Sequence, residues 1–519
     1  SSSSSGSGGV SGGGSNAGLP PGAAPSLPLP PATQQPPGSN TGDKYRAPGT
    51  NPFVMTSHDP FSTFAVDVDS ASYDIFRRDV KLNTLPQPAS VRLEDFVNAF
   101  PYEYAAPSNE DPAPFTVSVA AANQIFDRPT TLLRVGIQGR KPKAFEKRAA
   151  NLVYLVDVSG SMGSPDKLPL AKNLLIDSLN VLDPTDKVSI VSYAGNTSVR
   201  LGPTPVTQRA AIETAVSGLQ IGPGGTNGAG GLALAYEQAT AGFINEGINH
   251  VVMLTDGDFN VGVSSTKELL QIIRDKRKTG VTLTVIGFGI GNLNDDMMEA
   301  VSNAGNGIYS LVEDQAAAGK YVREKLLGTI DHIAKDVKIQ VEFNSAAVAA
   351  YRLLGYENRA LADSEFRMDG VDAGEIGAGH RVTALYELVP TGGIVPLRVG
   401  APAPVEGTPS PLMREITANE LVRVKVRWKT VAATELTPAY ELAFGLPLDA
   451  VKAGLEAADL DLQWAAAVAG FAEILKASPY ADRAWLPTIT SIVNVQVTRD
   501  PDRREFADLL ARALPLLPR

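Results

Sequence analysis

The stretch Asn151-Leu-Val-Tyr-Leu-Val-Asp-Val-Ser-Gly-Ser161 decides the fold and leads to the candidate site. Its first six residues form a mainly apolar run, which is typical of a buried strand. Asp157, Ser159 and Ser161 alternate along the following loop, and Gly160 lets the backbone turn between them. Hard cations such as Mg²⁺ prefer compact shells of oxygen atoms. The loop therefore predicts a divalent-cation site that lacks charge and needs a carboxylate from elsewhere, such as a partner protein.

Two later segments supply further oxygen ligands. Gly224-Gly-Thr-Asn-Gly228 is a glycine-rich loop that carries the hydroxyl of Thr226, and Val251-Val-Met-Leu-Thr-Asp256 is a second apolar strand ending in an Asp. Ligands of open α/β sheets bind at the carboxyl ends of strands. The predicted metal ligands are Asp157, Ser159, Ser161, Thr226 and Asp256, with Asp258 supporting them from outside. Mg²⁺ is the expected cation, and Mn²⁺ or Ca²⁺ could replace it.

These three parts, in this order, resemble the von Willebrand factor type A (VWA) domain and its metal-ion-dependent adhesion site (MIDAS). Further segments resemble the bacterial YfbK-like family over roughly residues 44–519: Phe61–Tyr73, Ser164–Leu168, Thr255–Gly262, Gly287–Asn294, Ile333–Asn344 and Tyr351–Asn358. The resemblance implies an envelope-associated, often lipid-anchored protein, in which family-specific regions flank a central VWA domain.

Composition excludes several functions. The chain has 519 residues, a net charge of −10 and no Cys. The negative charge argues against nucleic acid as a partner, since phosphate binding needs a basic face. The absence of Cys excludes disulfides and thiolate chemistry. No stretch approaches the ~20 apolar residues of a membrane helix.

Patterning divides the chain into five parts. Residues 1–50 form a Ser/Gly/Pro-rich segment expected to be a disordered tether. Its Gly9-Val-Ser-Gly-Gly13 matches a hydrolase motif, but lacks the strand and helix that the motif requires. Residues 51–148 are β-rich, 149–331 form the VWA domain, 332–446 are β-sandwich-like and 447–519 are helical.

The expected fold class is α/β, with a Rossmann-like VWA domain whose mainly parallel sheet has helices on both faces. Strands before and after this domain suggest that it is inserted in, or flanked by, one β-sandwich. Its expected strands are 151–156, 187–193, 250–254, 281–287 and 308–311. Its expected helices are 166–181, 207–218, 229–243, 265–278, 295–304 and 314–331, and a shift of the last helix could relay binding to the sandwich.

A second acidic cluster consists of Asp67, Asp69 and Ser70. It has two readings, a second metal site or a cap on the helix expected over 71–82, and the cap is favoured because Asp and Ser are preferred at that position.

The expected function is metal-dependent protein binding in the bacterial cell envelope, on the periplasmic or surface side of a membrane. A protein partner would supply an acidic residue, and a lipid anchor would lie on a Cys upstream of Ser1. The alternatives are a metal-assisted hydrolase and a structural scaffold without metal-dependent binding. A non-enzyme is preferred because the four His, at positions 58, 250, 332 and 380, are scattered and form no catalytic motif.

Overall fold

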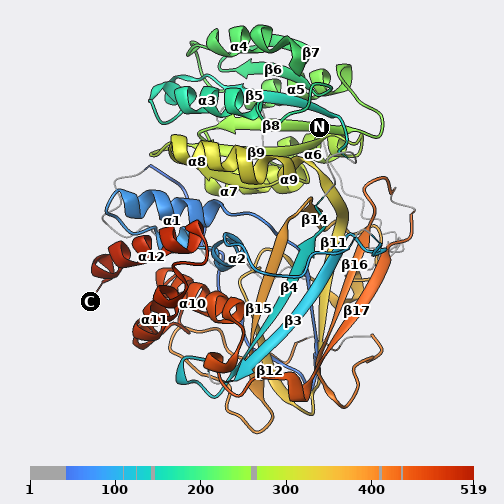
Figure 1. Cartoon of the computed structure of the whole chain (residues 1–519), viewed down its shortest axis with the longest axis vertical. Coiled ribbons are helices and arrows are strands. Elements are labelled where there is room, and N and C mark those ends of the chain that lie inside the picture. The colour runs from blue at the N-terminus through green and yellow to red at the C-terminus, as the bar shows by residue number, and fades with distance from the viewer. Residues whose placement is uncertain are drawn as a thin grey trace, which may run out of the picture. The chain divides into compact units, whose positions relative to one another are not determined.

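The computed structural model describes residues 42–518 except 109, 124, 142–146, 259–265, 408, 410–411 and 434–436. These residues belong to one compact unit that spans 36–519. Within it, Figure 1 shows an α/β domain, a β-sandwich and a group of helices that we call the helical cluster. The Gly9–Gly13 motif lies outside the described residues.

The α/β domain contains a six-stranded sheet of order β10-β9-β8-β5-β6-β7. All neighbours pair in parallel except β6 and β7, which are antiparallel. The strands are β5 (Ala150–Asp157), β6 (Lys187–Tyr193), β7 (Thr197–Pro205), β8 (Ile248–Thr255), β9 (Thr282–Phe288) and β10 (Tyr309–Val312). The sheet is therefore mixed, as expected for a mainly parallel sheet with one reversed edge.

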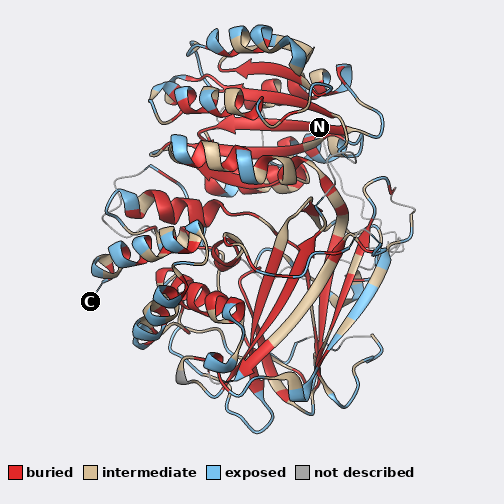
Figure 2. Cartoon of the chain, in the orientation of Figure 1, coloured by how far each residue is buried: buried red, intermediate tan, exposed pale blue. Residues whose placement is uncertain are grey.

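Helices cover both faces of this sheet. On one face lie α3 (Leu168–Ser178), α4 (Arg209–Ser217), α8 (Gln315–Lys320) and α9 (Leu326–Ile330). On the other lie α5 (Gly228–Ala241), α6 (Thr266–Arg277) and α7 (Asp295–Ala304). Successive side chains of β5 alternate between the two cores, and all eight of its residues are buried (Figure 2). This is why the strand appears in the sequence as a nearly continuous apolar run.

The sequence prediction missed one strand of this domain and one irregularity in its last helix, which otherwise lies where it was expected. The strand β7 was missed because it is a partly exposed edge strand and contains Pro203 and Pro205, which weaken the strand signal. The helix expected over 314–331 is divided into α8, a π-helical turn at Tyr321–Lys325 and α9.

The β-sandwich has two antiparallel sheets whose inner faces share one core. One sheet has the order β1-β12-β15-β4-β3, and the other β13-β2-β11-β16-β17 with β14 paired to β11. The strands before the α/β domain are β1 (Val54–Met55), β2 (Phe61–Ala65), β3 (Phe115–Asn123) and β4 (Thr131–Gly139). Those after it are β11 (His332–Phe343), β12 (Val348–Leu354), β13 (Ala360–Leu361), β14 (Gly374–Gly377), β15 (Arg381–Pro390), β16 (Glu420–Lys429) and β17 (Tyr440–Pro447).

Both sheets combine strands from the two sides of the α/β domain. β2 pairs with β11, and β4 pairs with β15. The α/β domain is therefore inserted in the sandwich, and residues 51–148 do not form a separate unit. Figure 2 shows β17 as a largely exposed outer strand.

The helical cluster joins the two ends of the chain. It contains α1 (Ala71–Lys81) and α2 (Leu93–Asn98) together with α10 (Leu460–Leu475), α11 (Leu486–Gln496) and α12 (Pro501–Ala513). Its core is aromatic, and the ring of Phe506 lies 5.3 Å from Phe100 and 5.5 Å from Trp464. α1 also packs against the α/β domain through Ala71 and Ile75.

Candidate metal site

Two neighbouring parallel strands bring the first carboxylates together. β5 and β8 run side by side, with Val156 opposite Leu254, so Asp157 and Asp256 follow the same edge of the sheet. Both residues are fully buried. The arrangement follows from two apolar strands that each end in an Asp, and it is the geometry expected for ligands at the carboxyl ends of strands.

The loop after β5 holds its oxygens by local hydrogen bonds. The backbone N–H of Ser159 donates to Oδ1 of Asp157 over 2.9 Å, and the hydroxyl of Thr255 donates to Oδ2 over 3.0 Å. The Oγ atoms of Ser159 and Ser161 lie 3.0 Å apart. Each carboxylate oxygen of Asp157 thus accepts one of these bonds and retains capacity for a further ligand.

The glycine-rich loop that carries Thr226 is tied to the same edge of the sheet. Gly222 N donates to the carbonyl of Val158 over 2.8 Å, and Asn227 N donates to the carbonyl of Ala194 over 2.7 Å. The side chain of Asn227 caps α5 by accepting a bond from Gly230 N. Thr226 is buried in this loop, and no hydrogen bond joins it to the other four predicted ligands in the described part of the chain.

The charges of the two carboxylates are balanced differently. Asp157 has no ion-pair partner among the described residues, and its burial raises its pKa to about 6. Asp256 accepts a bond of 3.0 Å from the ammonium of Lys167. Burial, followed by the charge of Asp256, raises the pKa of Asp258, whose backbone N–H donates to Oδ1 of Asp256 over 3.3 Å.

Sequence reasoning missed Lys167 and Asn292 as members of the site. Lys167 Nζ also donates to Oδ1 of Asn292 over 2.7 Å, and Asn292 Nδ2 donates to Oδ2 of Asp256 over 2.9 Å. Lys167 is in the segment Ser164–Leu168, and Asn292 in Gly287–Asn294, both of which carried the family resemblance. Both residues therefore lie in segments that the sequence analysis had singled out. No local sequence pattern, however, indicates that Lys167 and Asn292 contact each other.

The donor set fits a hard divalent cation. It consists of two carboxylates and three hydroxyls, all of which are oxygen donors suited to Mg²⁺. Among the described residues, no group of three or more His, Cys, Asp or Glu is placed to hold a metal ion, and the predicted ligand set differs from such a group because it combines two carboxylates with hydroxyls. A buried carboxylate without a counter-charge is costly, and a cation beside Asp157 would remove that cost.

The described part of the segment predicted as a tether, residues 42–50, contacts the α/β domain. Asp43 is buried and accepts backbone bonds from Gly291 N at 2.7 Å and Leu293 N at 3.0 Å. Lys44 N donates to the carbonyl of Leu293 over 2.7 Å. We call residues 42–46 the strap, because they fasten the chain to the loop that carries Asn292.

Both readings of the Asp67/Asp69/Ser70 cluster were wrong. Ser70 stands at the N-cap of α1, but no side chain makes a capping bond there. Asp69 instead accepts a bond from Tyr309 N of β10 over 2.9 Å, and Asp67 pairs with Arg359 over 2.7 Å. The cluster joins the N-terminal segment to the α/β domain through Asp69, and the guanidinium of Arg359 lies within 3.7 Å of both carboxylates.

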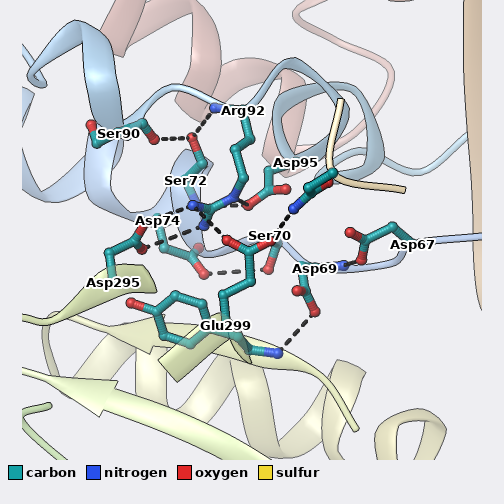
Figure 3. A network of polar contacts seen from close by, with 12 residues as sticks. Asp67, Asp69, Ser70, Ser72, Asp74, Ser90, Arg92, Asp95, Asp295 and Glu299 are labelled. Atoms are coloured by element: carbon teal, nitrogen blue, oxygen red, sulfur yellow. Dashed lines mark hydrogen bonds and ion pairs between the residues drawn. The ribbon is translucent and has the colours of Figure 1, made fainter. Parts of the chain in front are cut away.

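The acidic contacts continue around Arg92, as Figure 3 shows. Its guanidinium lies 2.6 Å from Asp295 of α7, 3.2 Å from Glu299 and 3.3 Å from Asp95. All of these side chains are buried. The network therefore connects the start of α2 to α7 of the α/β domain.

The histidines lie away from Asp157. His250 is in β8 and shares a hydrogen bond of 2.6 Å with Thr282; it lies near the start of its strand, opposite the metal loop. His332 begins β11 in the β-sandwich, and Nδ1 of His380 accepts a bond from Gly377 N. His58 lies 3.9 Å from Glu406. Burial lowers the pKa of both His250 and His380 to about 3.

Comparison with known families covers most of the chain. The model described as "Uncharacterized protein YfbK, C-terminal" matches residues 328–516, "von Willebrand factor type A domain" matches 151–324, and "von Willebrand factor" matches 39–134. No helix among the described residues is both long and apolar enough to cross a membrane.

Individual relatives and one solved structure are similar to this chain over different parts of its length. The chain is 35% identical over 477 residues to YfbK of Escherichia coli K12, which covers 91% of this chain and 81% of that protein. Human inter-alpha-trypsin inhibitor heavy chain H1 is 26% identical over 210 residues, or 39% of this chain and 22% of that protein. A solved von Willebrand factor type A structure from Catenulispora acidiphila has 17% identity and a TM-score of 0.42, and covers 79% of this chain and 88% of that one. The extent of the match to the E. coli protein shows that this chain belongs to the YfbK family of VWA-domain proteins.

Proposed function

We propose that this protein is a metal-dependent protein-binding module of the bacterial cell envelope. Asp157, Ser159, Ser161, Thr226 and Asp256 would hold Mg²⁺, and an Asp or Glu of a partner protein would complete its shell. The observation that carries the proposal is the buried carboxylate of Asp157, which has no ion-pair partner among the described residues and stands beside two hydroxyls 3.0 Å apart. VWA domains commonly mediate protein interactions.

The donor chemistry supports the need for an outside ligand. Mg²⁺ seeks six oxygen ligands and usually retains several waters. Two carboxylates, one of them already paired with Lys167, leave the cation undercharged. The bound ion would supply positive charge at the surface of the loop, which attracts a carboxylate.

We propose binding rather than catalysis because none of the four His, the residue type most often used for general acid–base catalysis, contacts Asp157 or Asp256 in the described structure. Lys167 contacts Asp256, and Asp258 lies close enough for the charge of Asp256 to raise its pKa. Lys167 is engaged by Asp256 and Asn292, and no His contacts the group.

The test is capture of partners from the envelope of the native organism. The full chain is used as wild type and as Asp157→Ala, each with Mg²⁺ and with EDTA. We expect a partner that binds wild type with Mg²⁺ and is lost in EDTA and in Asp157→Ala. We also propose that the native protein is lipid-anchored, and we expect it in the membrane fraction.

Asp183→Ala is the matched control. Asp183 is half-exposed and lies 3.7 Å from Lys147, so its substitution removes the same charge away from the site and should leave capture intact. Identical partner sets in all four conditions would refute the proposal. Turnover of a phosphate or peptide substrate that Asp157→Ala abolishes would favour the hydrolase instead.

A further inference from the structure

Lys167 is a buried cation inside the candidate metal site. Its side chain is 7% exposed, and its ammonium lies 3.0 Å from Oδ2 of Asp256, which is fully buried. The residue stands at the N-cap of α3, ten positions after Asp157 in the chain. Burial of an ammonium costs free energy unless it is paired and hydrogen-bonded, so this contact is a built feature of the site.

The surroundings fix the ammonium in this place. Asn292 accepts one bond from Lys167 Nζ and donates another to the same oxygen of Asp256, which closes a triangle of polar contacts. The stem of Lys167 lies against Gly289, where a Cβ would come within 2.3 Å of its Cε atom. Gly289 has φ +78°, a conformation that favours glycine. Space and hydrogen bonds both hold the side chain toward Asp256.

The charge count of the site changes as a result. Asp157 and Asp256 provide two negative charges, and Lys167 offsets one of them within contact distance. Affinity for hard divalent cations rises with the number of charged ligands, and a fixed positive charge nearby repels a cation. A site with one uncompensated carboxylate binds its ion weakly and gains most from a carboxylate supplied from outside.

We propose that Lys167 is a built-in counter-charge that weakens cation binding, so that stable occupancy depends on a carboxylate from the partner. This inference rests on the proposed function and adds its regulation. The ammonium of Lys167, beside Asp256, lowers the affinity of the free site for the cation, and the partner's carboxylate must make up the difference. Lys167 acts here through Asp256 and is a positioning and tuning residue.

The experiment measures Mn²⁺ and Mg²⁺ binding to the full chain by titration calorimetry, without any partner. Lys167→Met removes the charge and keeps an unbranched apolar stem, and Lys167→Gln keeps a hydrogen-bond donor without charge. Both variants are expected to bind Mn²⁺ about tenfold more tightly than wild type, or better. Circular dichroism checks that each variant is folded.

Lys172→Met is the matched control, since Lys172 is on the same helix and donates to the carbonyl of Ser217 outside the site. It makes the same substitution and the same change in net charge, and should leave the affinity unchanged. A gain of equal size in Lys172→Met would refute a local effect. Weaker or unchanged Mn²⁺ binding in both folded Lys167 variants would overturn the inference, because a purely structural role for Lys167 predicts loss or no change.

Failure of the inference is distinguishable from failure of the proposed function. If wild type and both Lys167 variants bind Mn²⁺ with equal affinity, the inference is wrong but the proposed function is not affected. Wild type that does not bind Mn²⁺ without a partner, with Lys167→Met that does, supports the counter-charge, and the capture experiment then tests the proposed function separately. Absence of Mn²⁺ binding in every form overturns the inference, whereas the proposed function is refuted only if partner capture does not depend on Mg²⁺ and Asp157.

Discussion

Glu94 provides a sharp test of the packing between the helical cluster and the rest of the chain. It is buried in α2, and among the described residues neither of its carboxylate oxygens has a hydrogen-bond partner. Burial, then the charges of Glu357 and Asp95, raises its pKa from 4.5 to about 8. The substitution Glu94→Gln removes this ionisable group while keeping its shape.

The direction of the pH effect follows from proton binding. The folded protein holds a proton on Glu94 that the unfolded chain releases near pH 4.5. Raising the pH from 4.5 to about 8 therefore favours unfolding, by about 1.4 kcal/mol per unit and about 5 kcal/mol in total. The contribution is present at low pH and is lost as the pH rises toward the folded pKa.

We expect Glu94→Gln to match wild type at pH 5 and to be more stable by about 3–5 kcal/mol at pH 9. The neutral amide also removes the repulsion that the charges of Glu357 and Asp95 exert on an ionised Glu94 at high pH. The free energy of unfolding would be measured in urea at several pH values by tryptophan fluorescence. Trp464 and Trp485 report on the cluster, because they share its core with α2.

Glu237→Gln is the control, since Glu237 is exposed on α5 and the same substitution there should not change the pH dependence. Asp95, whose pKa burial raises to about 7, stays in both proteins, so the difference between wild type and Glu94→Gln reports on Glu94 together with its interaction with Asp95. Stability curves that run parallel from pH 5 to 9, within 1 kcal/mol, would refute the reasoning.

Two further substitutions test the contacts between parts of the chain. Arg92→Met should lower the free energy of unfolding by about 3–5 kcal/mol in urea, because it leaves Asp295 buried without its guanidinium; a loss below 1 kcal/mol would contradict this. Phe506→Ala should cost about 3–5 kcal/mol through a cavity among the aromatic rings of the cluster, and unchanged unfolding followed by tryptophan fluorescence would show that this core adds little.

The α/β domain could be predicted because its strands are buried on both faces. The apolar run that ends at Asp157, and the one that ends at Asp256, give strong local signals, and both strands lie where the sequence places them. The edge strand β7 and the outer strand β17 bury little apolar surface. Their sequences therefore lack the clear alternation by which half-buried strands are recognised.

Contacts between distant segments had no local signal. The helical cluster joins α1 and α2 to helices about 400 residues later. No pattern within either segment predicts that the two segments pack together. Likewise Lys167 and Asp256 are 89 residues apart. The pattern of strands predicts that Asp256 is near Asp157, because both residues follow parallel strands. It does not predict that the ammonium of Lys167, at the start of α3, pairs with Asp256.

The Asp67/Asp69 cluster shows how composition can mislead. Two Asp residues just before a helix favour a cap, since Asp is preferred there. The backbone instead directs Asp69 to β10 and Asp67 to Arg359. Tertiary contacts decide the role of a polar residue when the sheet of another domain lies within hydrogen-bond distance of the helix start.

The strap makes the candidate site dependent on more than the α/β domain. Asp43 holds the backbone of the loop that carries Asn292, and Arg78 of α1 pairs with Asp43 over 3.0 Å and donates to the carbonyl of Gly289 over 3.3 Å. The same loop places Lys167 against Asp256. An isolated α/β domain would lack both Asp43 and Arg78, so its loop would lose the contacts that orient Asn292. Cation affinity measured on such a fragment would describe a different site, and the insertion of this domain in the chain is therefore part of how the site is built.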